Sequence, residues 1–250
     1  MSEDDLYRLS FEAVAEQYER ARPTYADDAL RWLAERIGIA PGRRVLDLAA
    51  GTGKLTRQLV ALGASVVAVE PGDAMRALLE RVVPEAEPLV GSAEAIPLAD
   101  ASVDAITVGQ AYHWFRPEEA LAEMHRVLRP GGAVALLWNQ WDEEDPLQRE
   151  IDELLEPLRP PAASHEEEDR PGEKALEATP LFGPIEERLF RHTRTLDADR
   201  LVEWVSSTSA VVTAQPAEQT RIEARVRSLA GEGTVELSLK TLVLVVDRVS

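Results

Sequence analysis

Between residues 43 and 138 the chain alternates short apolar runs with longer segments in which apolar residues recur every three or four positions. The short runs predict buried strands, and the periodic segments predict helices with one apolar face. Strands that alternate with helices are typical of a parallel sheet covered by helices. The pattern therefore predicts an α/β fold for this region.

The predicted elements follow one another at short intervals. Helices are predicted at 26–37, 54–62 and 73–82, and a fourth begins at Pro117, where the first turn tolerates a residue without an N–H group. Strands are predicted at 45–48, 65–69, 103–108 and 133–138, the last one introduced by Gly131 and Gly132.

The pattern changes after Trp138. The acidic segment 142–156 carries leucine and isoleucine at helical spacing and predicts a helix. Residues 157–172 combine prolines with a run of acidic residues and predict a surface loop. Two further strands are predicted at 185–190 and 241–247, and chain order suggests an antiparallel pair with a long helical insert.

Composition narrows the class of protein. A chain of 250 residues, 45% of them hydrophobic, suits one large α/β domain or a core with an elaborated lid. The absence of cysteine excludes disulfides, thiolate metal sites and a cysteine nucleophile. The four histidines are far apart in the sequence, so no metal site is expected.

The net charge of −18 gives the chain a field that repels nucleic acids and anionic membrane surfaces. No apolar run approaches the roughly 18 residues that span a bilayer. The first residues are acidic and lack the basic and apolar stretches of a secretory signal. We therefore expect a cytoplasmic protein that binds neither nucleic acid nor membrane.

A glycine-rich turn marks the first candidate site. Gly51 and Gly53 follow the predicted strand 45–48 and precede a helix, so the backbone can turn tightly and a ligand can approach it closely. A dinucleotide-binding turn would have glycine or alanine where Thr56 stands, and this argues against an NAD-type oxidoreductase.

Two carboxylates flank this turn. Asp47 lies at the carboxyl end of one strand, where it would repel a pyrophosphate and suit a cationic group, although it also fits a simple capping role. Glu70 ends the next strand, at the position that faces the ribose of a nucleotide-like cofactor in this kind of fold. Together they favour a positively charged nucleoside ligand.

Several motifs over residues 10 to 140 carry a resemblance to a known family. They are Phe11-Glu12-Ala13-Val14-Ala15-Glu16-Gln17-Tyr18, the glycine turn, Glu70-Pro71, Gly91-Ser92-Ala93-Glu94-Ala95-Ile96-Pro97-Leu98, Asp104, Ala111-Tyr112-His113-Trp114-Phe115 and Leu128-Arg129-Pro130-Gly131-Gly132. In these motifs the chain resembles the class I methyltransferases that use S-adenosylmethionine (SAM), specifically the type that acts on small molecules.

The resemblance implies a Rossmann-like, seven-stranded, mostly parallel sheet with its last strand antiparallel and with a helical lid or insert. It also implies SAM as cofactor and assigns the residues that bind it. Members of the family often have an acid where this chain has Ser92, so contact with the adenine passes to the Ser92 hydroxyl, to Glu94 or to the backbone. The cofactor-binding candidates are Asp47, Ala49, Gly51, Gly53, Glu70, Pro71, Ser92, Ala93, Glu94, Gln110, Tyr18 and Arg22.

Methyl transfer needs alignment of the acceptor more than a dedicated catalytic group. His113 is the candidate general base, with support of the methionine pocket as its alternative role. Five aromatic residues near strand ends and in the later insert are candidates for the wall of an acceptor pocket, namely Tyr112, Trp114, Trp138, Trp141 and Trp204.

The expected organisation is a single domain with four parts. Residues 1–40 form a helical segment that covers the cofactor, and 41–140 form the SAM-binding core. Residues 141–184 form an acidic helix and loop, and 185–250 contribute the last strands and the helical insert. The expected activity is O-, N- or C-methylation of a small molecule, with a carboxylic acid as one candidate. A SAM-binding scaffold or partner subunit without catalysis is the alternative.

Overall fold

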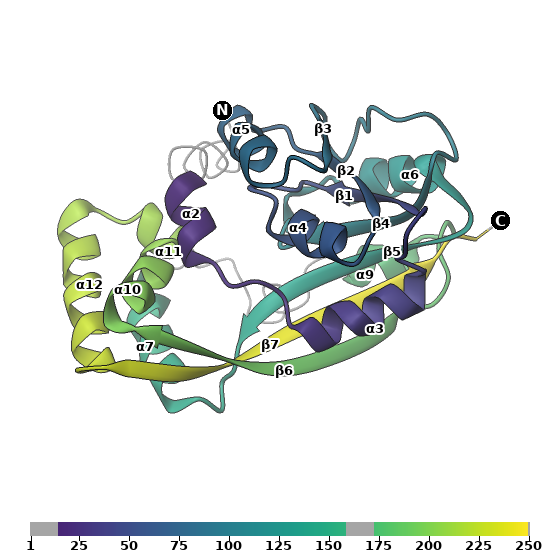
Figure 1. Cartoon of the computed structure of the whole chain (residues 1–250). Helices are drawn as coiled ribbons and strands as arrows, with labels where there is room; N and C mark the ends of the chain where they lie inside the picture. Colours follow the sequence, from purple (N-terminus) through teal and green to yellow (C-terminus); the bar gives the residue numbers. More distant parts are fainter. Residues whose placement is uncertain (1–14, 159–172, 250) are drawn as a thin grey trace. The chain divides into compact units, whose positions relative to one another are not determined.

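A seven-stranded sheet forms the framework of the computed structural model, which describes residues 15–158 and 173–249 (Figure 1). The strand order is β3-β2-β1-β4-β5-β7-β6. Neighbouring strands from β3 to β5 pair in parallel, and the last strand of the chain, β7, runs antiparallel. The predicted Rossmann-like α/β fold is confirmed.

The strands are short in the first half of the chain and long in the second half. They are β1 (Arg44–Leu48), β2 (Ser65–Val69), β3 (Glu87–Leu89), β4 (Val103–Gly109), β5 (Leu128–Trp141), β6 (Glu186–Asp197) and β7 (Thr234–Asp247).

The helices include two single-turn 3₁₀ segments. They are α2 (Ala15–Ala21), α3 (Asp27–Ile37), α4 (Lys54–Ala61), α5 (Asp73–Val82), η1 (Tyr112–Trp114), α6 (Pro117–Val127), α7 (Pro146–Leu155), η2 (Glu156–Leu158), α9 (Glu173–Ala178), α10 (Ala198–Ser206), α11 (Ser209–Val212) and α12 (Pro216–Ala230).

The structure corrects four of the predicted elements. Helix α7 begins at Pro146 and not at residue 142, because the Asp145 side chain accepts hydrogen bonds from the N–H groups of Leu147 and Gln148 and caps the helix there. Strands β5, β6 and β7 extend well beyond the predicted limits. The predicted loop at 157–172 lies largely outside the described residues.

The described chain divides into two compact units. The larger unit contains residues 24–139, 173–190 and 241–249, and the smaller unit contains residues 15–23, 140–158 and 191–240. The boundaries fall within β5, β6 and β7, and one lies between α2 and α3. The prediction that residues 1–40 cover the cofactor stays a prediction.

In the larger unit, helices cover both faces of the sheet. Apolar residues of α3 and α4, such as Leu33 and Leu59, pack against Val45, Val66 and other residues on one face. Residues of α6 and α9, such as Met124 and Leu176, pack on the opposite face. This arrangement leaves the carboxyl ends of the parallel strands as the edge where polar residues gather.

The smaller unit has an apolar core of its own. This core is formed by the end of α2, the inner faces of α7, α10 and α12, and parts of β6 and β7; its members include Ile151, Leu201 and Ile222.

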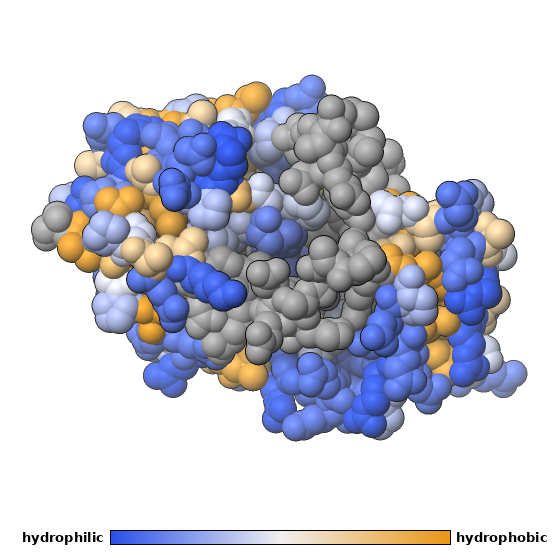
Figure 2. Space-filling model, turned by 180° about the vertical axis from the view of Figure 1, so that it is seen from behind, coloured by the Kyte–Doolittle hydropathy of each residue, from blue (hydrophilic) through white to orange (hydrophobic). Residues whose placement is uncertain are grey.

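Hydrophilic residues cover much of the described surface visible in Figure 2, with apolar residues scattered among them. Within the described residues, no helix combines the length and the apolar character needed to cross a membrane.

Candidate functional site

The glycine turn leaves β1 through a series of left-handed backbone conformations. Ala49, Gly51 and Gly53 have φ values of 56°, 58° and 87°. A Cβ atom added to Gly51 would meet no atom of residues 15–158 and 173–249 within 4 Å, whereas one added to Gly53 would lie 3.0 Å from Val83 and 3.1 Å from Leu79. Within this part of the chain, Gly51 therefore borders space that a ligand can enter, and Gly53 serves the packing of α4 on α5.

Glu70 is held across this turn by two backbone groups. The Gly51 N–H donates to its Oε2 over 2.9 Å, and the Gly72 N–H donates to its Oε1 over 2.8 Å. The residue is 92% buried at the end of β2. A carboxylate oxygen can accept more than one hydrogen bond, so a carboxylate fixed in this way is suited to a vicinal diol.

Asp47 lies within the core beneath the turn. Its Oδ2 accepts from the Thr56 hydroxyl at 2.6 Å and its Oδ1 accepts from the Thr107 hydroxyl at 3.1 Å. Burial raises the pKa of Asp47 to about 7, and the charge of Glu70 adds to the rise, while the threonine bonds oppose it. Contact between Asp47 and a ligand stays a prediction.

Thr56 and Thr107, the two donors to Asp47, are not identified as candidates by the sequence. In the sequence Thr56 marks a departure from the dinucleotide pattern, although it also stands one helical turn after the glycines. Thr107 comes from β4, which pairs with β1 at Asp47. No local sequence signal connects Thr107 to a residue 60 positions earlier.

In the segment around Ser92, the carboxylate of Glu94 accepts hydrogen bonds from neighbouring residues. Ser92 and Ala95 form an isolated antiparallel bridge, Ala93 is buried, and the Arg116 N–H donates to Glu94 Oε1 over 3.0 Å. Burial favours the neutral acid, but the bonds from Arg116 and from the Ser92 hydroxyl together lower the pKa of Glu94. Ser92 and Glu94 are thus coupled, and which of them meets an adenine stays open.

Gln110 continues the site at the end of β4. It has a φ of 60°, which is uncommon for a residue with a side chain, and such strain often occurs at functional sites. Its Nε2 donates to the Asn139 carbonyl over 3.0 Å. Asn139 in turn donates to the Thr24 carbonyl and accepts from the Thr241 hydroxyl. The sequence did not predict this network.

The aromatic side chains of the short helix η1 differ in their burial. Tyr112 is 1% exposed, and burial raises its pKa to about 12. Its hydroxyl has no hydrogen-bond partner among the described residues. His113 and Trp114 are exposed, with ring centroids 4.6 Å apart. His113 is therefore accessible from solvent.

The five aromatic residues predicted to line a pocket fall into three groups. Tyr112 and Trp138 belong to the same buried core of the larger unit. Trp114 contacts His113. In the smaller unit, Trp141 and Trp204 stack with ring centroids 4.8 Å apart and planes inclined by 9°.

Two of the remaining three candidates lie between elements, and the third lies within a helix. Pro71 follows Glu70 and precedes α5. Tyr18 lies in α2, and its side chain is outside the described part of the structure. The Arg22 Nη2 donates to the Ser207 carbonyl over 2.8 Å, within the smaller unit.

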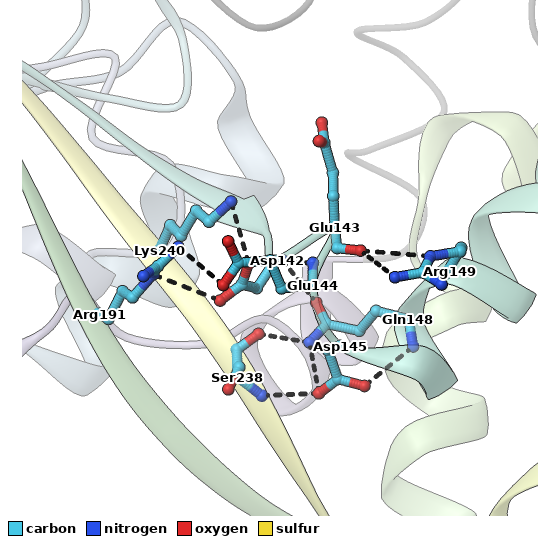
Figure 3. Close-up of polar contacts among 9 residues, drawn as sticks. All are labelled: Asp142, Glu143, Glu144, Asp145, Gln148, Arg149, Arg191, Ser238 and Lys240. Atoms are coloured by element: carbon cyan, nitrogen blue, oxygen red, sulfur yellow. Dashed lines mark hydrogen bonds and ion pairs between the residues drawn. The ribbon is translucent and has the colours of Figure 1, made fainter.

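A polar cluster that the sequence did not predict ties together three strands of the smaller unit (Figure 3). Buried Asp142 at the end of β5 lies 3.0 Å from Lys240 Nζ of β7 and 3.5 Å from Arg191 Nε of β6. Asp145 accepts from the Ser238 N–H over 2.9 Å. Within residues 15–158 and 173–249, no group of acidic or histidine side chains is placed to hold a metal ion.

The comparisons with known proteins agree with one another. A family model described as a methyltransferase domain matches residues 46–136. An uncharacterized methyltransferase of Mycobacterium tuberculosis is 39% identical over 224 residues, which cover 88% of this chain and 85% of the relative. A demethylmenaquinone methyltransferase of Renibacterium salmoninarum is 36% identical over 135 residues, which cover 49% of this chain and 57% of the relative.

The fold comparison gives the same class. The solved structure of a protein from Anaeromyxobacter dehalogenans, proposed to be a Type II methyltransferase, matches with a TM-score of 0.65 and 25% identity, covering 91% of this chain and 97% of that one. The chain belongs to the class I SAM-dependent methyltransferase family.

Proposed function

We propose that the protein transfers the methyl group of SAM to a small organic acceptor. The observation that carries the proposal is the placement of Glu70, whose carboxylate is fixed by the Gly51 and Gly72 N–H groups beside open space at the glycine turn. A carboxylate held in this way can bind the two ribose hydroxyls of a nucleoside.

The donor set fits SAM as a ligand. The charge of Glu70 makes the surroundings of the turn acidic, and Asp47 adds to it when ionised, which favours a cationic sulfonium and ammonium group over phosphates. Gln110 and Ala49, both in left-handed conformations at neighbouring strand ends, present backbone groups to the same edge. We assign Ala49, Gly51, Glu70, Ser92, Ala93 and Gln110 to cofactor binding, with Asp47 beneath them.

Bound SAM supplies an electrophilic methyl group whose sulfur leaves as a neutral thioether. The task of the protein is to hold the acceptor in line and exclude water, which can contribute about 7–11 kcal/mol to lowering the barrier. We place His113 as the base that takes a proton from an acidic acceptor group, because it is exposed in η1, which follows β4. The chemistry allows O-, N- or C-methylation.

A replacement of His113 tests that role. We expect His113→Ala to lower the rate of methyl transfer about 100-fold, the typical contribution of a general base, with little change in affinity for S-adenosylhomocysteine. His125→Ala on α6 is the matched control and leaves both unchanged. An equal loss of rate and affinity in His113→Ala would assign the residue to the binding pocket.

The cofactor itself is tested by thermal shift. S-adenosylhomocysteine at 100-fold over its dissociation constant should stabilise the fold by about 2.7 kcal/mol, whereas NAD should not. A melting temperature raised by NAD and not by S-adenosylhomocysteine would refute the proposal. An assay of labelled methyl transfer to a panel of metabolites then separates an enzyme from a SAM-binding scaffold, since a scaffold labels none of them.

A further inference from the structure

Helix α6 binds the loop that carries the adenine candidates. Residues 90–102 join β3 to β4 and form no helix or strand, apart from the isolated bridge between Ser92 and Ala95. Gly91 and Pro97 meet at the base of this segment, because a Cβ atom added to Gly91 would lie 2.6 Å from Pro97 Cδ. Residues 91–100 are here called the α6-bound loop. A loop with so few backbone bonds of its own depends on its neighbours for a fixed shape.

The guanidinium of Arg126, in the last turn of α6, donates five hydrogen bonds and so uses its full set of N–H groups. Its Nη2 donates to the Ile96 carbonyl over 3.0 Å, and its Nη1 donates to the Leu98 carbonyl over 2.8 Å. Nη1 also donates to Asp100 Oδ1 over 2.8 Å. The other two bonds go to Glu123, from Nε over 2.6 Å and from Nη2 over 2.7 Å. Three of the five donors therefore hold the loop.

Glu123 holds the same loop residue from its other side. Its Oε2 accepts from the Ile96 N–H over 2.9 Å, so the Glu123–Arg126 pair binds both the N–H and the carbonyl of Ile96. The bond from Arg126 lowers the pKa of Glu123 against the opposing effect of burial, and the bond from Ile96 lowers it further. Both side chains are only partly exposed, so water screens this pair less than a surface pair.

The first turn of α6 binds the loop a second time. The N–H of Arg116, the N-cap residue of α6, donates to Glu94 Oε1 over 3.0 Å. Glu123 follows Arg116 by about two helical turns, so the loop is held at two separate points of one helix. The buried face of α6 packs in the apolar core of the larger unit. The segment between Ser92 and Ile96 is thus attached to a rigid support.

We propose that Glu123 and Arg126 are positioning residues of the cofactor site, which act through the α6-bound loop on recognition of the adenine base. This inference rests on the proposed function, in which residues 92–94 meet the adenine. Recognition of a base by hydrogen bonds needs donors and acceptors that are held in place before the ligand arrives. Glu123 and Arg126 supply that order without touching the cofactor.

An arginine and a glutamate three residues apart on a helix often stabilise only that helix. Arg221 and Glu218 of α12 form such a pair, in which Nε and Nη2 donate to the two carboxylate oxygens as they do in α6. The pair in α6 differs because Arg126 also donates to the loop. The α12 pair is therefore a matched control.

The experiment compares S-adenosylhomocysteine with S-inosylhomocysteine, in which a carbonyl oxygen replaces the adenine amino group. Calorimetric titration of the full chain gives both dissociation constants. We expect the wild type to bind S-adenosylhomocysteine about tenfold more tightly, since the altered base leaves polar groups of the loop unpaired. A lysine has three donors and no planar fork, so Arg126→Lys should reduce this preference to about threefold or less. Arg221→Lys should retain it.

A merely structural role would not change the ratio of affinities for two ligands that differ only in the base. If folded Arg126→Lys loses affinity for both ligands equally, or for neither, the proposal is overturned. A wild type that binds both ligands equally overturns it as well. If S-adenosylhomocysteine does not bind the wild type at all, the proposed function fails and this inference fails with it.

A second variant covers the case in which Arg126→Lys does not fold. Glu123→Gln keeps the size of the side chain and an acceptor for the Ile96 N–H, but it loses the charge that orients Arg126. We expect the preference for S-adenosylhomocysteine to fall several-fold in this variant also. An unchanged preference in folded Glu123→Gln overturns the proposal.

Hydrogen exchange on the wild type tests the same coupling without any variant. If the loop orders the adenine site, adenine must in turn stabilise the bound loop, because coupling between two sites is reciprocal. Exchange of the Ile96 amide hydrogen should therefore slow with S-adenosylhomocysteine and stay unchanged with S-ribosylhomocysteine, which lacks the base. Equal protection by both ligands, or by neither, overturns the proposal.

Discussion

Gly51 and Gly53 share a left-handed backbone but have different surroundings, and their alanine variants should separate ligand binding from folding. Gly53→Ala brings a methyl group to 3.0 Å from Val83 and adds backbone strain, so we expect a loss of about 1–3 kcal/mol in unfolding free energy. Gly51→Ala meets open space, so strain alone should cost about 1 kcal/mol.

Chemical denaturation and S-adenosylhomocysteine titration of both variants check this expectation. Gly51→Ala should lose the greater part of its ligand affinity, because the added methyl group occupies the space assigned to the cofactor. Gly53→Ala should show the larger loss of stability. Equal stability losses with unchanged affinities would contradict the placement of the ligand at Gly51.

Asp47 should make the stability of the fold depend on pH in an unusual direction. Because burial raises the pKa of Asp47 to about 7, the folded chain keeps a proton that the unfolded chain loses near the ordinary aspartate pKa of 3.8. The contribution of Asp47 is thus fully present below that value and falls as pH rises to 7, by up to about 1.4 kcal/mol per pH unit.

Asp47→Asn should remove this slope. The difference in unfolding free energy between wild type and variant, measured from pH 4 to pH 8, should change in favour of the variant up to pH 7 and then level off. Asp28→Asn, at an exposed position of α3, is the control and should leave the wild-type slope intact. A parallel wild-type and Asp47→Asn profile would show that Asp47 titrates normally.

At the scale of elements, the ion cluster of the smaller unit should be a source of stability. Asp142 and Lys240 have side chains only 4% and 16% exposed, so removing one charge leaves the other poorly hydrated. We expect Asp142→Asn to cost about 2–4 kcal/mol in unfolding free energy. Urea denaturation measures the loss.

Glu144→Gln provides the matched control for this cluster. Glu144 also pairs with Arg191, at 3.2 Å, but its side chain is 76% exposed. Exposed pairs contribute little, so the change should stay within about 0.5 kcal/mol. Similar losses for both variants would show that burial does not decide the strength of the cluster.

Prediction from sequence succeeded where local pattern decides the structure. Strand β2 and helix α5 have the predicted limits, because an apolar run and the spacing of apolar residues along a helix are local features. β3 escaped prediction: it has three residues, one of them a proline, and occupies the edge of the sheet. The added length of β6 was missed because most of its side chains are polar and partly exposed.

The candidate site, like the fold, was predictable only where local sequence order decides it. The positions of Glu70 and the glycine turn follow from the order of strand, turn and helix. Contacts between strands far apart in the chain determine the rest of the site. They bring Thr107 to Asp47, Thr241 to Asn139, and Lys240 to Asp142 in the polar cluster. Neither spacing nor composition encodes those contacts.

At the scale of the whole molecule, the net charge should prevent the binding of nucleic acids. With a formal charge of −18, the protein should not retain DNA or RNA at physiological salt. A gel-shift assay at 20 mM and 150 mM salt checks this expectation. Retention at 20 mM salt that disappears at 150 mM would reveal a local basic surface strong enough to overcome the overall charge.

The strand order also bears on how the chain acquires its fold. β6 is made before β7, yet β7 lies between β5 and β6 in the sheet. During synthesis, therefore, β6 has no neighbour with which to form hydrogen bonds, and the edge of β5 stays open to any extended segment. When β7 inserts, it pairs with the open edge of β5 and with β6 in the same step. The nascent protein therefore depends on a late step to avoid self-association.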